Sequence, residues 1–135
     1  MVDVDALLTL TPPADQTQVG STQYDWLLAD LNAHPHRCVA AYWHRPIFST
    51  GPHGPSKNML AIFQLLYDQG VDLVLVGHDH TYERFAKARP DGTADPVRGV
   101  RQIVIGTGGA ALYSFTATSP LTEAREQLDE RCPAR

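Results

Sequence analysis

Two histidines that stand two residues apart are the side chains of this sequence best placed to do chemistry. His78 and His80 follow a glycine directly after the apolar run 71–76, which has the composition of a buried strand. Ligand sites of α/β proteins lie at the carboxyl ends of such strands, and the glycine is expected to let the backbone turn sharply there. His44 ends a second apolar run, residues 38–43. Because imidazole binds zinc, iron, nickel and copper, the pattern predicts a metal site.

A metal site of this kind activates water, and a nearby histidine could then supply a proton. Two metal ions ~3.5–4 Å apart can clamp a phosphoryl group and bridge a hydroxide, and water bound to a metal is acidified toward neutrality. The alkoxide that leaves needs a proton. His53 lies in the same Gly- and Pro-rich loop as His44, residues 44–55, so it is the candidate general acid. The alternative is a solvated loop histidine without function.

Other residues of reactive type have simpler interpretations. His34 and His36 stand on either side of a proline at the expected end of a helix, and no function is assigned to them. Residues 106–109, Gly-Thr-Gly-Gly, lack the lysine and the helix of a phosphate-binding loop, which favours a tight turn where backbone segments pass closely. Glu83 and Arg84 are either an ion pair or hydrogen-bonding groups that support the histidines from behind, or charged outer positions of a half-exposed strand.

The elements that must position these histidines follow from hydrophobic periodicity and turn residues. A first helix is capped by Ser21 or Thr22 and stopped by Pro35, and a second begins near Ser56 and ends at Gly70. The predicted strands are residues 4–10, 38–43, 71–76, 82–88 and 101–105, and a short polar helix is predicted at 122–129. This order predicts an α/β fold with partly parallel pairing, in which the last strands are antiparallel additions.

Length and composition predict one domain or part of one. The chain has 135 residues, 43% of them hydrophobic, and a net charge of −4 from 15 acidic and 11 basic residues. The acidic balance argues against a nucleic-acid-binding surface. No apolar run approaches the ~18 residues of a membrane-spanning helix. The first residues lack the basic region of a signal peptide, so the compartment is left open. Cys38 is expected to be a small buried hydrophobe.

Residues 77–84, Gly-His-Asp-His-Thr-Tyr-Glu-Arg, resemble a segment of calcineurin-like metallophosphoesterases, most closely of the purple-acid-phosphatase-like branch. Three further segments are similar to that family: residues 43–46 to its upstream histidine motif, residues 21–27 to the preceding helix, and residues 105–109 to a late glycine turn. The resemblance covers about residues 20–115, and the paired histidine motifs in this order are specific.

The resemblance implies a metal-dependent phosphoric ester hydrolase, a phosphatase or phosphodiesterase that acts on a small-molecule ester. In that family two metal ions, most often iron, zinc or manganese, lie between the two sheets of an α/β sandwich. Carried over by motif, His44 and His78 would bind one metal ion and His80 the other, and His53 would lie near the leaving group. The alternatives are a non-catalytic metal-binding or interaction module that keeps the histidines, and a structural protein without metal.

Three segments of the family have no counterpart in this sequence: Asp-x-His, Gly-Asp-x-x-Asp and Gly-Asn-His. No Gly-Asp dipeptide occurs, and the asparagines are Asn32 and Asn58 alone. The expectation is therefore that residues 1–115 form the carboxyl-terminal part of a metallophosphoesterase domain, half of an α/β sandwich with mixed sheets flanked by helices. Residues 116–135 are expected to be a polar tail. Such a half would be inactive alone, would expose apolar faces, and would associate with a missing amino-terminal half or with itself.

Overall fold

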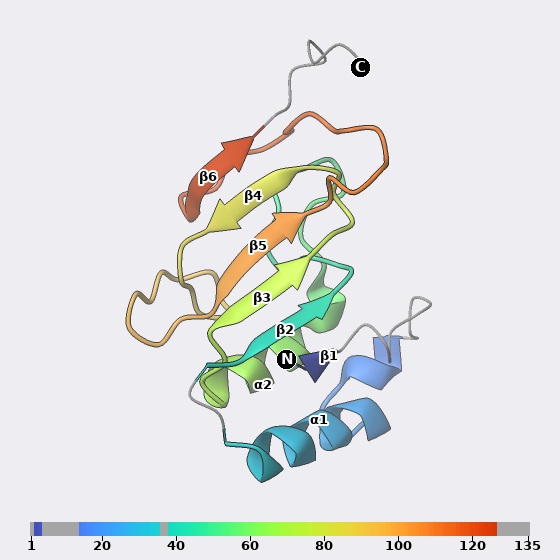
Figure 1. Ribbon diagram of the computed structural model, residues 1–135, viewed down its shortest axis with the longest axis vertical. Helices are drawn as coiled ribbons and strands as arrows, with labels where there is room; N and C mark the ends of the chain where they lie inside the picture. The colour runs from blue at the N-terminus through green and yellow to red at the C-terminus, as the bar shows by residue number, and fades with distance from the viewer. Residues whose placement is uncertain (1, 4–13, 36–37, 127–135) are drawn as a thin grey trace.

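Short strands rich in aliphatic residues build one mixed sheet in the computed structural model, which describes residues 2–3, 14–35 and 38–126. Across the sheet the order is β1 (Val2–Asp3), β2 (Ala40–Trp43), β3 (Leu73–Val76), β5 (Arg101–Ile105), β4 (Tyr82–Phe85) and β6 (Thr122–Glu126) (Figure 1). The strands β1, β2, β3 and β5 are parallel, and β4 is antiparallel to both of its neighbours. The predicted parallel core with antiparallel additions is confirmed.

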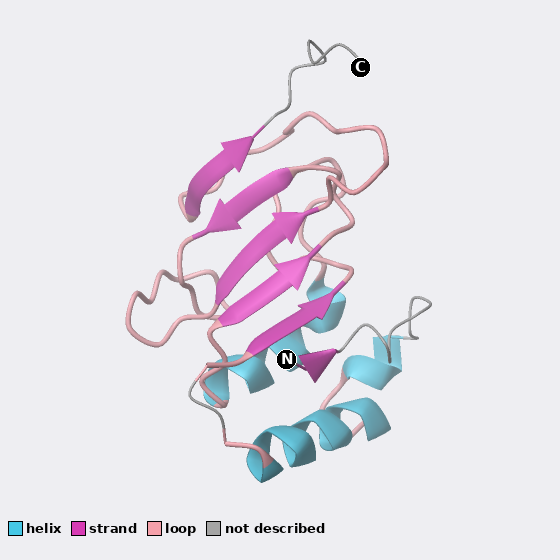
Figure 2. Cartoon of the chain, viewed as in Figure 1, coloured by secondary structure: helices cyan, strands magenta, loops and turns pink. Residues whose placement is uncertain are grey.

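Two helices connect the parallel strands, and each begins or ends at a residue that the sequence singled out. In α1 (Thr22–Ala33) the Ser21 hydroxyl accepts a hydrogen bond from the Tyr24 amide at 3.2 Å. After α2 (Leu60–Asp68) the chain leaves through Gly70 with φ of +73°, a conformation that glycine adopts without strain. Single turns of 3-10 helix, η1 (Ala14–Thr17) and η2 (Lys57–Met59), precede the two helices. Both helices lie at one side of the sheet (Figure 2).

The core fills the space between these helices and one face of the sheet. Phe63 of α2 is fully buried and meets the rings of Trp43 and Phe48 edge-on, at centroid distances of 6.4 and 5.5 Å. The opposite face of the sheet carries the alternate residues of the same strands. Its central row, Tyr42, Leu75 and Ile103, is only partly buried. Because parallel sheets normally bury both faces, this apolar row is a surface that the described residues leave half covered.

Two local predictions are wrong, and the segment 4–10 lies outside the described residues. Residues 122–126, predicted as the start of a polar helix, form β6 along the edge of β4. Glu123 there contacts Arg84 and Arg101 at 3.4 and 2.5 Å, so pairing with an available strand edge overrides local preference. Part of the segment expected to be a polar tail is therefore a strand. Cys38 is exposed rather than buried, because it precedes β2.

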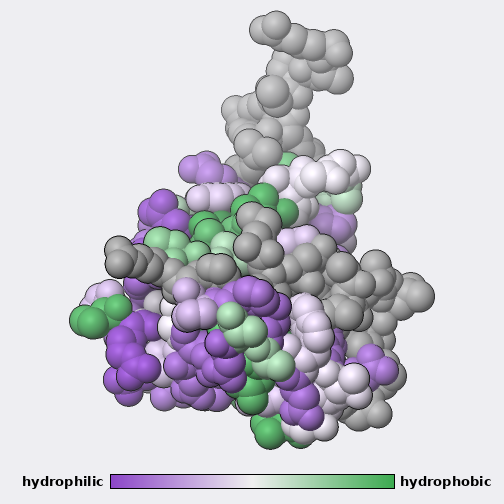
Figure 3. Space-filling model, turned by 60° about the horizontal axis from the view of Figure 1, so that its bottom comes forward, coloured by the Kyte–Doolittle hydropathy of each residue, from purple (hydrophilic) through white to green (hydrophobic). Residues whose placement is uncertain are grey.

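Within the described ranges, none of the helices has the length and apolarity needed to cross a lipid bilayer. From the end of the molecule that carries the helices, the described surface consists mostly of hydrophilic and near-neutral residues, with separate hydrophobic patches (Figure 3).

Candidate functional site

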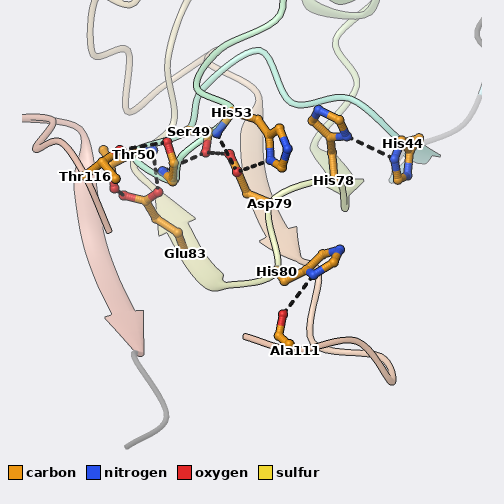
Figure 4. Close-up of polar contacts among 11 residues, drawn as sticks. His44, Ser49, Thr50, His53, His78, Asp79, His80, Glu83, Ala111 and Thr116 are labelled. Carbon is orange, nitrogen blue, oxygen red and sulfur yellow. Dashed lines mark hydrogen bonds and ion pairs between the residues drawn. The ribbon is translucent and has the colours of Figure 1, made fainter. Parts of the chain in front are cut away.

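Strand register brings two of the predicted ligands together. In the parallel pair of β2 and β3, Trp43 is opposite Val76, so the residues that follow them lie side by side. The Gly77 amide donates to the His44 carbonyl at 3.0 Å. The ring atoms Nδ1 of His78 and Nε2 of His44 are then 3.1 Å apart (Figure 4).

The sharp turn after β3 falls on a histidine rather than on the glycine before it. His78 has φ of +69°, and it is the single non-glycine residue in the left-handed region among the residues described. For an L-residue with a Cβ atom this conformation costs about 1–2 kcal/mol. A Cβ on Gly77 would meet nothing closer than His44 Nδ1 at 3.7 Å. The expected role of the glycine is thus corrected: His78 carries the strain, as residues of functional sites often do.

His53 is held by a buried carboxylate that sequence reasoning passed over. The side chain of Asp79 is fully buried. It accepts hydrogen bonds from the backbone amide of His53 at 3.0 Å, from Nδ1 of the His53 ring at 3.0 Å, and from the Ser49 hydroxyl. The His53 ring lies 4.4 Å from the His78 ring, centroid to centroid. A signal was present in the sequence, because Asp79 is an acidic residue between two candidate ligands at a strand end and has no lysine or arginine within four residues.

His80 is oriented from a different direction. Its Nδ1 lies 2.9 Å from the carbonyl oxygen of Ala111, which leaves Nε2 free of this contact. Metal-binding histidines are commonly oriented by such a bond. The Tyr113 ring stacks on the imidazole, with centroids 4.2 Å apart and an interplanar angle of 13°. Figure 4 shows the His80 ring apart from the other three, toward the loop after β5.

The loop that carries His53 is fixed by two more buried side chains. Glu83 accepts from the Thr50 amide at 3.0 Å, from the Thr50 hydroxyl at 2.8 Å and from the Thr122 hydroxyl at 2.7 Å. Gln102 accepts from the Ile47 amide at 2.9 Å. Of the alternatives left open for Glu83 and Arg84, an ion pair between the two is not formed. Glu83 instead supports the loop from inside, and Arg84 pairs across the sheet.

The glycine-rich segment after β5 is a close backbone crossing. A Cβ on Gly106 would overlap the carbonyl oxygen of Asp79, and the Gly106 amide donates to the Thr81 carbonyl at 3.0 Å. This confirms the interpretation of residues 106–109 as a tight structural turn. A hollow of about 230 Å³ lies nearby, and it is lined by His80, Tyr82, Thr107, Leu112, Tyr113 and Glu126.

The surroundings of the site favour the neutral form of the His78 imidazole and the ionised form of the Asp79 carboxylate. Burial lowers the pKa of His78, and the neighbouring His53 and His44 rings lower it further. Neutral imidazole is the form that binds metal. Burial acts to raise the pKa of Asp79, but hydrogen bonds from Ser49 and His53 outweigh that effect and hold the pKa below its usual value.

The donor set fits part of a metal site. The two nitrogens of His44 and His78 are 3.1 Å apart, near the roughly 3.3 Å that separates two nitrogen ligands of one tetrahedral zinc ion. Among the described residues, no group of three or more His, Cys, Asp or Glu side chains is arranged to hold a metal ion. A complete site would need ligands from elsewhere. His34 is exposed next to Asp30, with Nδ1 3.2 Å from its carboxylate, and His36 lies outside the described residues.

Known proteins share both the sequence pattern and the fold. The family model described as calcineurin-like phosphoesterase matches residues 1–82. The chain is 40% identical over 116 residues to purple acid phosphatase 21 of Arabidopsis thaliana, which covers 78% of this chain and 26% of that protein.

Two solved structures are similar in fold. The purple acid phosphatase PPD1 of yellow lupin superposes with a TM-score of 0.72 at 19% identity, over 81% of this chain and 23% of that one. GAP50, described as the anchor in the inner membrane complex of Plasmodium, superposes with a TM-score of 0.62 at 17% identity, over 92% of this chain and 36% of that one. The chain thus spans about a quarter to a third of these longer proteins.

Proposed function

This chain belongs to the calcineurin-like phosphoesterase family, and we propose that its histidine cluster forms part of a metal-dependent site that hydrolyses phosphoric esters. The observation that carries the proposal is the meeting of His44 and His78 at the ends of neighbouring parallel strands, with ring nitrogens 3.1 Å apart. Such an approach of two imidazoles is unfavourable if both are protonated, and it suits two neutral rings that share a cation.

His44 and His78 would hold one metal ion, and His80 would contribute to a second. Iron, zinc and manganese suit these ligands, and when bound they would polarise the phosphoryl group and acidify a water molecule. The lowered pKa of His78 supports this role, because the ring is then neutral without metal. The bond between His80 Nδ1 and the Ala111 carbonyl supports it too, since Nε2 is left to bind.

His53 would donate the proton that the leaving oxygen requires. Its backbone amide and its Nδ1 are both held by Asp79, so Nε2 is the ring nitrogen that remains for proton transfer. The hollow beside His80 offers a small ester a place for its organic part, with two tyrosines and a leucine in the walls.

Further polypeptide would complete the site. We propose that it supplies carboxylates and covers the half-exposed sheet face of Tyr42, Leu75 and Ile103. Two observations support this partner: purple acid phosphatase 21 is nearly four times as long as the segment that it shares with this chain, and no group of three or more His, Cys, Asp or Glu side chains among the described residues is arranged to hold a metal ion. Alone, the chain is expected to be inactive. It is also expected to self-associate, and gel filtration measures this association.

A second candidate function is a non-catalytic module that retains the histidines. The lack of a three-ligand cluster in the described part of the chain favours it, and the similar fold of GAP50 belongs to a protein described as an anchor. The two functions differ in turnover, because an interaction module would bind metal or a partner without hydrolysing an ester.

Metal content of the purified chain tests the proposed function. Elemental analysis should find manganese or zinc bound to the chain and lost from a His44→Ala/His78→Ala/His80→Ala variant. His34→Ala, which removes an exposed histidine of α1, is the matched control and should keep the metal. Metal that is retained by the triple variant would contradict the assignment. Hydrolysis of p-nitrophenyl phosphate, measured after the metal-loaded chain is combined with the polypeptide that completes the site, would then separate the enzyme from the interaction module.

A further inference from the structure

One buried side chain of the site lies between the predicted ligands and has a contact pattern unlike theirs. Asp79 is fully buried, and both of its carboxylate oxygens are occupied. Oδ2 accepts from the Ser49 hydroxyl, and Oδ1 accepts from the amide and from the ring Nδ1 of His53, both at 3.0 Å. Neither oxygen is directed at the pair of His44 and His78 in Figure 4.

We propose that Asp79 is a positioning residue, which fixes the His53 ring with Nδ1 as the hydrogen-bond donor and leaves Nε2 facing the site. The chemical meaning of this inference rests on the proposed function, whereas the orientation of the ring does not. When His53 gives its Nε2 proton to the leaving oxygen, an N–H bond breaks and an O–H bond forms. The ring becomes the neutral Nδ1–H form, and its remaining proton is still donated to Asp79.

The packing around Asp79 shows what a turned His53 ring would lose. A Cβ at Gly51 would lie 2.5 Å from Asp79 Cγ, so the loop backbone closes directly over the carboxylate and excludes water. A buried carboxylate is costly unless it is hydrogen-bonded, and flipping the imidazole would remove one of its donors. The amide bond from the same His53 residue fixes the backbone while Nδ1 fixes the ring. Because both hydrogen bonds come from His53, they restrain its backbone and its ring together, and the bond at Nδ1 determines which ring nitrogen remains for the site.

The rest of the loop is held independently of Asp79. Glu83 holds Thr50 through its amide and hydroxyl, and Gln102 holds the amide of Ile47. If Asp79 served only to stabilise the loop, its contribution would partly repeat that of Glu83 and Gln102. The contact with the His53 ring is one that these anchors do not duplicate, because they hold Thr50 and Ile47.

Nuclear magnetic resonance of the full, metal-free chain tests the orientation. Long-range correlations of the imidazole nitrogens, recorded on the neutral ring, show which nitrogen carries hydrogen. A His53→Gln variant identifies the His53 signals by their loss. The expected result is that His53 is the Nδ1–H tautomer in the native chain. Asp79→Leu, which has the same number of side-chain heavy atoms but no hydrogen-bond acceptor, should shift it toward the Nε2–H tautomer.

Ser49→Ala is the matched control, because it removes a different hydrogen bond from the same carboxylate. It should leave the His53 tautomer unchanged. An Nε2–H tautomer in the native chain would overturn the inference, and so would an Asp79→Leu variant with the native tautomer. If Asp79→Leu does not fold, the native spectrum alone decides. Since the sample holds neither metal nor substrate, the outcome is separate from that of the proposed function, which metal content and hydrolysis decide.

Discussion

Two buried aspartates of this molecule each stabilise a loop by accepting hydrogen bonds from it. They differ in the basic side chain that each of them also contacts. Asp79 binds the loop of His53, and its ring partner can exchange a proton. Asp95 caps the turn between β4 and β5, and its charged partner is the guanidinium of Arg89, with Nε 3.3 Å from the carboxylate. Arginine stays protonated at any ordinary pH. The nature of the partner, and not burial, therefore separates the candidate site from the scaffold.

The contacts of Asp95 form a complete structural unit. Oδ1 accepts from the amides of Val97 and Arg98 at 3.2 and 3.0 Å, and Oδ2 accepts from the Tyr67 hydroxyl at 3.0 Å. The amide of Arg98, acting against the effect of burial and with help from Tyr67 and Arg89, lowers the pKa of Asp95 to about 2. Asp79 has a lowered pKa as well, so charge state does not distinguish the two residues either.

Removal of the site carboxylate is expected to have the largest effect. Asp79→Ala leaves the buried Ser49 hydroxyl contact and two donors of His53 without an acceptor, and we expect a loss of about 3 kcal/mol in the free energy of unfolding. Urea denaturation measures it. Asp95→Ala should also destabilise the chain, yet leave the ring spectrum of His53 unchanged. A changed His53 spectrum in Asp95→Ala would erase the distinction between the two aspartates.

A smaller loss is expected when the loop is pushed away from Asp79 without changing any polar group. Gly51→Ala places a Cβ 2.5 Å from Asp79 Cγ, and we expect about 1–3 kcal/mol of destabilisation from overpacking. Gly108→Ala is the control, because a Cβ there meets nothing within 4 Å and its φ is not positive. Equal stability of the two variants in urea would show that the loop does not close on the carboxylate as described.

The strain at His78 predicts an unusual order of stability. His78 has φ of +69°, a conformation that glycine adopts without strain and alanine does not. The free energy of unfolding of His78→Gly should therefore be about 1 kcal/mol higher than that of His78→Ala. Both variants remove the imidazole, which makes them a matched pair. The opposite order in chemical denaturation would mean that the turn is not held in this conformation.

Acid should weaken the scaffold through Asp95 in a defined window. The pKa of Asp95 is about 2 in the folded chain and about 3.9 in an unfolded one, so the unfolded state binds more protons between these values. The stabilisation is present above about pH 4 and is lost as the pH falls toward about 2. Melting temperatures of the native chain and of Asp95→Asn should therefore converge between pH 4 and 2. A gap that persists at pH 2 would assign the effect of Asp95 to packing.

Local signals in the sequence were sufficient for the two helices and for the position of the histidines at strand ends. The Ser21 cap, Gly70 and the apolar periodicity predict α1 and α2, because these depend on residues within one or two turns. β6 was missed because its strand conformation comes from the edge of β4. Asp79 was missed for a similar reason, since its partner His53 lies 26 residues away and reaches it through the folded loop.

X-ray absorption at the zinc edge of the zinc-loaded chain tests the central claim, that the strand-end histidines bind metal. The account predicts imidazole nitrogens at about 2.0–2.1 Å from the metal. Their number should fall in a His44→Ala/His78→Ala variant and stay unchanged in His34→Ala. A spectrum of oxygen ligands alone in the native chain, or unchanged imidazole coordination in the double variant, would contradict it.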